Sequence, residues 1–133
     1  MLVDFGAKVD GYCSDHTRCI FCGEPNRKQE EAYEKLQETF KQILKEIKPG
    51  RKVAEISAKY REYLHCCALD FPSHSLGHGI GLEVHEYPSF ADASGDVVRE
   101  DSTLAIEPST YYKEFGARFE ETVLVTKNGA RII

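Results

Sequence analysis

The chain has 133 residues, of which 41% are hydrophobic and 29% are charged, and its formal net charge is −5. This composition is typical of a globular domain and excludes a disordered tail, a collagen-like repeat and a disulfide-rich miniprotein. The acidic excess argues against nucleic acid or an anionic membrane as a partner, and no run approaches the roughly 18 apolar residues of a membrane span.

The first segment, residues 2–9, is mostly apolar with one acid inside it. Asp10-Gly11 follows, and this dipeptide is typical of a hairpin turn. Residues 12–22 are rich in types that favour extended backbone. We therefore expect an N-terminal β-hairpin.

Two helices are expected next. Apolar residues recur at spacings of three and four through residues 27–48, with Asn26 as an acceptable N-cap and Pro49 and Gly50 as a stop signal. A second helix of the same kind is expected over roughly residues 53–65. The charged residues between the apolar ones are best explained as solvent-exposed helix faces.

The remaining half of the chain is expected to form strands and loops. We expect a histidine-rich segment at 73–88, a loop at 92–101, a short apolar run ending in an acid at 104–108, a strand at 118–126 and the end of another at 131–133. The order of strands, helices and further strands predicts an α+β fold. One domain, or part of one, should occupy residues 1–133.

Four acids stand inside segments expected to be partly buried strands: Asp4, Asp15, Glu107 and Glu120. An ionised carboxylate in such a place costs several kcal/mol unless it is paired, hydrogen-bonded or bound to a metal. A shared cation is the simplest common cause. Strand alternation does not decide between Glu120 and its neighbour Glu121, which remains an alternative ligand.

Three histidines lie within twelve positions, at His74, His78 and His85, and glycines occupy positions 77, 79 and 81 among them. The spacing is not HExxH, and the glycines make the helix of such a zinc motif implausible. Glycines here let the backbone approach a ligand closely. The segment therefore favours a functional site over isolated structural histidines.

These motifs resemble the catalytic domain of the pita-bread-fold metallopeptidases, which include methionine aminopeptidase, aminopeptidase P and prolidase. The matching strings, in order, are Val3–Gly6 leading to Gly11–Arg18, then His74–Glu86, Ile106–Pro108 and Ala117–Glu120. The short gap between the last two is similar to that of the prolidase and aminopeptidase P branch.

The resemblance implies a pita-bread fold that lacks its N-terminal portion, because the first metal-binding aspartate of the family falls here on residue 4. A sheet without its leading strands would leave an open edge. We therefore expect a fragment of a longer protein, a proteolytic product, or a shortened relative that pairs with another copy of itself.

By this resemblance the metal ligands fall on Asp4, Asp15, His78, Glu107 and Glu120. Four carboxylates and one imidazole are too many for one tetrahedral zinc and suit two divalent cations, such as Mn²⁺, Co²⁺, Fe²⁺ or Zn²⁺. The family pattern makes Asp15 and Glu120 bridge the two metals. Asp4 completes one metal, and His78 with Glu107 completes the other.

The resemblance also implies catalytic roles. A hydroxide bridging the two metals would attack the peptide carbonyl, with Glu107 as the proton shuttle. His74 and His85 match positions that hold the substrate and stabilise the tetrahedral intermediate. Arg118 is expected to neutralise and orient a ligand carboxylate. Its place two residues before Glu120 favours Glu120 as the last ligand.

The implied activity is that of an Xaa-Pro dipeptidase or aminopeptidase, whose substrate is a peptide with proline after the scissile bond. The alternative is a truncated or non-catalytic pita-bread protein that binds peptides or proteins. Non-catalytic relatives typically lose metal ligands, whereas all five positions are filled here. The sequence therefore favours the enzyme.

A minor alternative is a zinc module built on Cys19 and Cys22, which have the spacing of a zinc knuckle. The adjacent pair Cys66 and Cys67 is a poor second knuckle. The five cysteines are an odd number, and no basic segment leads into an apolar stretch at the N-terminus. Both observations favour reduced thiols in a cytoplasmic protein.

Overall fold

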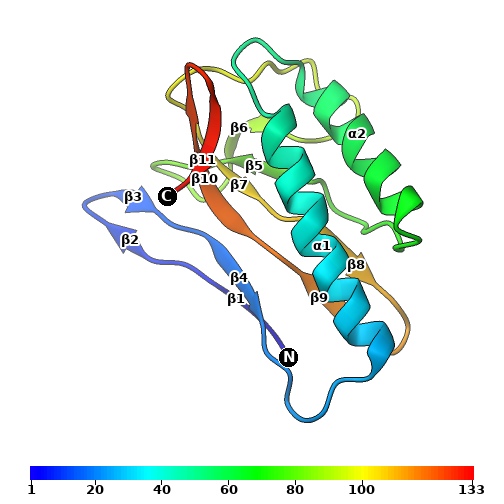
Figure 1. Cartoon of the computed structure of the whole chain (residues 1–133). Coiled ribbons are helices and arrows are strands. Elements are labelled where there is room, and N and C mark those ends of the chain that lie inside the picture. Colours follow the sequence, from blue (N-terminus) through cyan, green and yellow to red (C-terminus); the bar gives the residue numbers. More distant parts are fainter.

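The computed structural model describes residues 1–133 and has an α+β architecture. Two helices lie side by side on one face of a five-stranded antiparallel sheet, and an N-terminal hairpin extends away from this sheet (Figure 1). The elements in chain order are β1 (Leu2–Phe5), β2 (Lys8–Val9), β3 (Tyr12–Cys13), β4 (His16–Cys19), α1 (Arg27–Glu46), α2 (Val53–Cys66), β5 (Gly77–Gly79), β6 (Glu86–Ser89), β7 (Thr103–Ile106), β8 (Ser109–Tyr111), β9 (Gly116–Arg118), β10 (Glu121–Thr126) and β11 (Gly129–Ile132).

The hairpin forms where the sequence predicts it, with β1 paired to β4 and β2 paired to β3. Its ladder is interrupted in the middle. A Cβ on Gly6 would lie 2.2 Å from the Ser14 carbonyl oxygen, so the two chains approach more closely here than a side chain allows. The Ala7 N–H donates to Ser14 Oγ at 3.1 Å instead of to a backbone oxygen. Asp15 therefore lies in a break between two strands, and not within one continuous strand as predicted.

Helix α1 begins with a capping box. The Asn26 side chain accepts a hydrogen bond from the Gln29 backbone N–H at 3.0 Å, and the Gln29 side chain accepts one from the Asn26 N–H at 2.9 Å. These two bonds satisfy orphan donors of the first turn. The helix ends at Glu46, two residues before the predicted end. The observed bounds of α2 differ from the predicted bounds by one residue.

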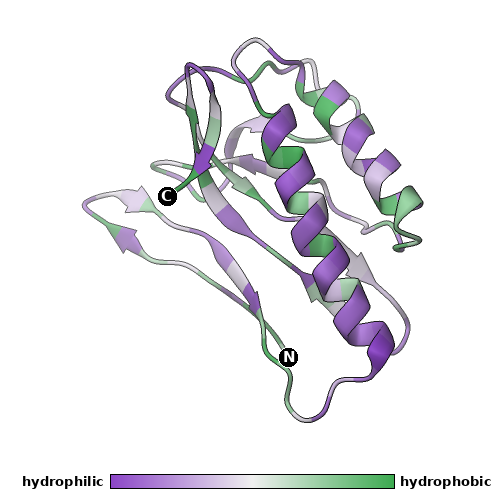
Figure 2. Cartoon of the chain, in the orientation of Figure 1, coloured by the Kyte–Doolittle hydropathy of each residue, from purple (hydrophilic) through white to green (hydrophobic).

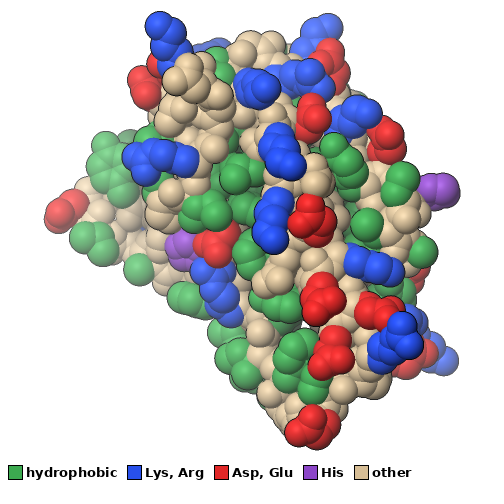
Figure 3. All heavy atoms as spheres, viewed as in Figure 1, with side chains coloured by type: hydrophobic (Ala, Val, Ile, Leu, Met, Phe, Trp, Pro, Cys, Tyr) green, Lys and Arg blue, Asp and Glu red, His purple; other side chains and the backbone are tan.

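The helices bury one apolar stripe each against the sheet and expose a charged face. Figure 2 shows the apolar residues recurring along both helices, and Figure 3 shows lysine, arginine and acidic side chains interspersed over the outer face. The buried hydrophobic cluster contains Ala32, Leu36, Phe40, Ile43, Ile47, Val53, Ile56, Tyr60, Leu64, Leu69, Leu76, Phe90, Val98, Leu104, Ile106, Ala117, Val123 and Val125. The predicted amphipathic pattern is confirmed. No helix has the length and apolar character needed to cross a membrane.

The predicted strand over 118–126 is divided in two. β9 pairs with β8, whereas β10 lies between β7 and β11 in the five-stranded sheet. Phe119 and Glu120 connect them, and the Phe119 N–H donates to the Pro108 carbonyl at 3.0 Å. The chain thus passes from one sheet to another at these two residues, which frees Glu120 from a regular ladder position.

Glycines place β5 inside the sheet, in the order β11-β10-β7-β5-β6. A Cβ on Gly77 would lie 2.1 Å from the Ala105 carbonyl oxygen, and one on Gly79 would lie 2.3 Å from the Tyr87 carbonyl oxygen. No larger residue fits either position without a backbone shift. His78 is thereby held between two closely approaching strands.

Candidate metal centre

The five predicted ligands come from separate elements. Asp4 lies in β1, Asp15 between β3 and β4, and His78 in β5, whereas Glu107 follows β7 and Glu120 connects β9 and β10. Three of the four carboxylates therefore lie where a ladder ends or is broken. At such positions a side chain can turn towards a common centre, because its backbone is not fixed by two neighbouring strands.

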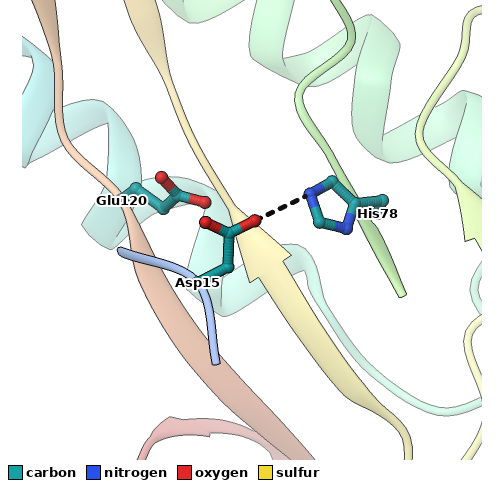
Figure 4. A group of neighbouring side chains, drawn as sticks. All are labelled: Asp15, His78 and Glu120. Atoms are coloured by element: carbon teal, nitrogen blue, oxygen red, sulfur yellow. Dashed lines mark ion pairs between the residues drawn. The ribbon is translucent and has the colours of Figure 1, made fainter. Parts of the chain in front are cut away.

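Three of these side chains meet. One ligand atom each from Asp15, His78 and Glu120 lies within 4.8 Å of the other two, and the group is buried or nearly so. Figure 4 shows the Asp15 carboxylate between Glu120 and the imidazole, with His78 Nε2 at 3.5 Å from Asp15 Oδ2. His78 Nδ1 lies 3.0 Å from the Gly79 carbonyl oxygen. That contact orients the ring with Nε2 towards the carboxylates.

Glu107 adjoins this group, and Asp4 stands at its edge. Glu107 Oε1 is 3.9 Å from His78 Nε2, and Glu107 Oε2 is 3.4 Å from Arg118 Nη1. The same guanidinium atom donates to Asp4 Oδ2 at 2.8 Å. Asp4 is thus connected to the centre through Arg118, and its side chain is half exposed. The structure brings Asp15, His78 and Glu120 together directly.

Burial raises the pKa of Glu107 and of Glu120 to about 7 each. Burial also raises the pKa of Asp15, with a further contribution from the negative charge of Asp4. Such carboxylates are costly to ionise side by side in a buried place unless cations neutralise them. Hard carboxylate oxygens with one imidazole form the donor set that divalent first-row metals accept. The residues present therefore fit divalent cations.

A pH dependence of stability follows for the metal-free chain. Because the folded pKa values of Glu107 and Glu120 exceed the ordinary value of 4.5, their contribution to stability is complete below pH 4.5 and is lost as the pH rises through about 7. The expected loss is about a few kcal/mol for the pair. Thermal unfolding in chelator between pH 4.5 and 8 measures it.

Glu120→Gln serves as the control for this experiment, since it removes one of the two titrating groups and should flatten the pH profile. Added Mn²⁺ should raise the melting temperature most at the upper end of the range, where the ligands are deprotonated. The same profile in wild type and Glu120→Gln, with no effect of Mn²⁺, would contradict this assignment.

His74 and His85 lie beside the centre and line a cavity of about 450 Å³ together with His78 and Glu107. His74 Nδ1 is 3.6 Å from Glu107 Oε2, and the rings of His85 and His78 are 4.3 Å apart between centroids. Burial lowers the pKa of His74, which favours its neutral imidazole. Both predicted substrate-binding histidines therefore reach the cavity.

Sequence reasoning missed two residues of the centre. Thr17 Oγ donates to Glu120 Oε2 at 2.5 Å, and the Tyr111 hydroxyl lies 2.9 Å from Arg118 Nη2 and 3.2 Å from His74 Nε2. The position of Thr17, two residues after Asp15, was an available signal, because such residues share one face of a strand. Nothing in the sequence singles out Tyr111.

The structure also bears on the two alternative predictions, which are Glu121 as the last metal ligand and a zinc module built on Cys19 and Cys22. Glu121 is not part of the metal-binding group: Arg18 Nη2 donates to both of its carboxylate oxygens at 3.0 Å, and His16 Nδ1 lies 3.6 Å from Oε2. Cys19 Sγ contacts the backbone of residue 118, and Cys22 is exposed. Neither cysteine belongs to the metal-binding group, and all five cysteines are free. The geometry does not support a zinc module.

Comparisons with known proteins agree with the resemblance. The model of metallopeptidase family M24 matches residues 1–127. The Xaa-Pro dipeptidases of Pyrococcus furiosus and Pyrococcus horikoshii are 41% and 40% identical over 133 residues, which cover 98% of this chain and 38% of each relative. The solved prolidase from Pyrococcus furiosus superimposes with a TM-score of 0.92 over 98% of this chain and 40% of that one.

The chain thus spans about 38% of the length of these curated relatives. Its architecture is that part of the pita-bread fold, and the solved Xaa-Pro aminopeptidase of Thermotoga maritima shares it with a TM-score of 0.90 at 34% identity, over 98% of this chain and 38% of that one. Family match, relatives and structures cover the candidate centre throughout. The chain belongs to metallopeptidase family M24.

Proposed function

We propose that the chain carries the dinuclear metal centre of a peptidase that hydrolyses Xaa-Pro peptide bonds. The observation that carries this proposal is the meeting of Asp15, His78 and Glu120 within 4.8 Å, although they lie far apart in the sequence. The relatives that are 41% and 40% identical are Xaa-Pro dipeptidases, which supports the substrate class.

In this proposal Asp4, Asp15, His78, Glu107 and Glu120 would together hold two cations. The donor set suits Mn²⁺, Co²⁺, Fe²⁺ or Zn²⁺. When bound, two such cations supply Lewis acidity that polarises a carbonyl and lowers the pKa of water from about 15.7 towards 7.

The chain's own residues would handle the proton and the substrate. Glu107 lies 3.9 Å from His78 Nε2 and lines the cavity, where it would take up and return a proton as the general acid and base that the family resemblance implies. His74 and His85 border the same cavity, where imidazole N–H groups would donate hydrogen bonds to charge that develops on the substrate carbonyl. Arg118 holds Asp4 and Glu107 in place.

Hydrolysis of a panel of Xaa-Pro dipeptides by the purified chain, with Mn²⁺ or Co²⁺ added, tests this function. The expected result is metal-dependent release of proline, with an Xaa-Ala dipeptide as the matched control that is cleaved far more slowly. Mn²⁺ binding without hydrolysis of any Xaa-Pro dipeptide would contradict the proposal and favour a peptide-binding module.

A further inference from the structure

The N-terminal arm, defined as residues 1–20, is attached to the rest of the chain mainly by side chains. β1 and β4 pair only with each other, and no ladder joins β4 to β9 or β10. The single backbone hydrogen bond between the arm and residues 27–133 runs from the Cys13 N–H to the Gly81 carbonyl at 2.7 Å. Yet the arm supplies Asp4 and Asp15 to the candidate centre. The arm's position must therefore be fixed by other contacts.

Two adjacent residues of β4 supply such contacts, and both act on Glu120. Thr17 is fully buried and donates from its hydroxyl to Glu120 Oε2 at 2.5 Å. Arg18 donates to the Glu120 backbone carbonyl at 2.8 Å and to both carboxylate oxygens of Glu121 at 3.0 Å. Alternation along β4 sends Thr17 to one side and Arg18 to the other. Glu120 is therefore held at its carboxylate and at its backbone.

Thr17 provides the one side-chain hydrogen bond to the Glu120 carboxylate, which forms no ion pair with a basic residue. Hydrogen bonds to an ionised oxygen are shorter and stronger than neutral ones. Because the Thr17 hydroxyl is hydrogen-bonded to Glu120 Oε2, it also fixes the direction in which the other carboxylate oxygen, Oε1, points. A carboxylate held in this way loses little freedom when a cation binds, whereas an unheld carboxylate must first be ordered.

We propose that Thr17 and Arg18 are positioning residues that fix Glu120 for metal binding and hold the arm against the rest of the chain. This inference rests on the proposed metal centre. The centre takes Asp15 from the arm and His78 and Glu120 from outside it, so metal binding and docking of the arm favour one another. Loss of the contacts at Thr17 or Arg18 should weaken both.

Mn²⁺ affinity, measured from the electron paramagnetic resonance signal of free Mn²⁺, tests the role of Thr17. Thr17→Val keeps the shape but removes the hydroxyl, and we expect it to weaken Mn²⁺ binding by about 10- to 100-fold. Thr17→Ser keeps the hydroxyl and should stay within about threefold of wild type. Thr39→Val is the matched control, because Thr39 is buried in α1 and its hydroxyl has no partner. It should leave the affinity unchanged.

A double-mutant cycle separates positioning from a general loss of stability. If Thr17 acts through Glu120, Thr17→Val should change Mn²⁺ affinity by less than about twofold in a Glu120→Gln background. An equal loss in both backgrounds would overturn the inference. So would a Thr17→Val chain that binds Mn²⁺ as tightly as wild type.

Arg18 supplies a second test that does not depend on the folding of Thr17→Val. In Arg18→Gln without metal, amide hydrogen exchange should become faster in the arm and stay unchanged in α1 and β10, and Mn²⁺ should restore protection of the arm. Unchanged exchange in the arm would overturn the role of Arg18. Wild-type chain that binds Mn²⁺ without cleaving Xaa-Pro peptides would contradict only the proposed function, whereas absence of Mn²⁺ binding would contradict both.

Discussion

Replacing Asp15 with Asn is expected to lower kcat/KM for Xaa-Pro hydrolysis by about a thousandfold or more. The substitution keeps the size of the side chain and removes the charge that would bridge two cations, whose stabilisation of the transition state amounts to several kcal/mol. The backbone should be unaffected, since the Asp15 carbonyl still accepts the Thr122 hydroxyl at 3.0 Å. Steady-state kinetics with added Mn²⁺, together with metal content per chain, measures the effect.

Asp10→Asn is the matched control for this substitution. Asp10 lies in the same arm, is exposed at the hairpin turn and has a positive φ of 51°, which asparagine also tolerates. It should keep wild-type hydrolysis and metal content. Equal rates for wild type and Asp15→Asn would contradict the proposed mechanism.

Replacing Phe40 with Ala is expected to lower the free energy of unfolding by about 3–5 kcal/mol. Phe40 is buried on α1 and packs edge-to-face on Phe119, with ring centroids 5.1 Å apart. The substitution leaves a cavity beneath the connection between β9 and β10. Because Phe119 precedes Glu120 in that connection, Mn²⁺ affinity should fall as well. Urea unfolding monitored by circular dichroism gives the change in stability.

Phe71→Ala is the control for the core substitution, because about half of the Phe71 side chain is exposed. Its cost should stay within roughly 0.5 kcal/mol, as for other surface substitutions. A loss below about 1 kcal/mol in Phe40→Ala would show that α1 does not anchor the sheet in the way described.

The helices and the hairpin could be predicted from the sequence because their signals are local. The spacing of apolar residues indicates α1, and Asn26 marks its start as an N-cap, which in the structure forms part of a capping box. Asp10-Gly11 marks the hairpin turn in the same way. The division of residues 118–126 between two sheets could not be predicted, because alternation shows which side chains share a face but not which strand lies alongside.

The candidate site could be predicted in part, for a different reason. An acid inside an apolar segment is conspicuous because it would be costly to bury, and Asp15, Glu107 and Glu120 were found on that ground. Thr17 and Tyr111 carry no such cost, so this criterion identifies neither of them. The choice between Glu120 and Glu121 depended on the resemblance, since the pairing of Glu121 with Arg18 is a long-range contact that local pattern does not show.

The resemblance to the pita-bread metallopeptidases contributed what spacing could not. It assigned roles to histidines that the pattern only grouped, and the match to family M24 over residues 1–127 confirms the family. The relatives are much longer than this chain, so the peptidase activity of these 133 residues stays a prediction. The arm is the part on which that prediction depends most, because it carries two of the five proposed ligands.

A crystal structure of the chain soaked in Mn²⁺, with anomalous difference density at the manganese edge, tests the dinuclear centre most directly. Two peaks a few ångströms apart are expected, both contacted by Asp15 and Glu120, one also by Asp4 and the other by His78. A single peak held by His78 alone, or manganese bound elsewhere while these side chains stay apart, would contradict the account.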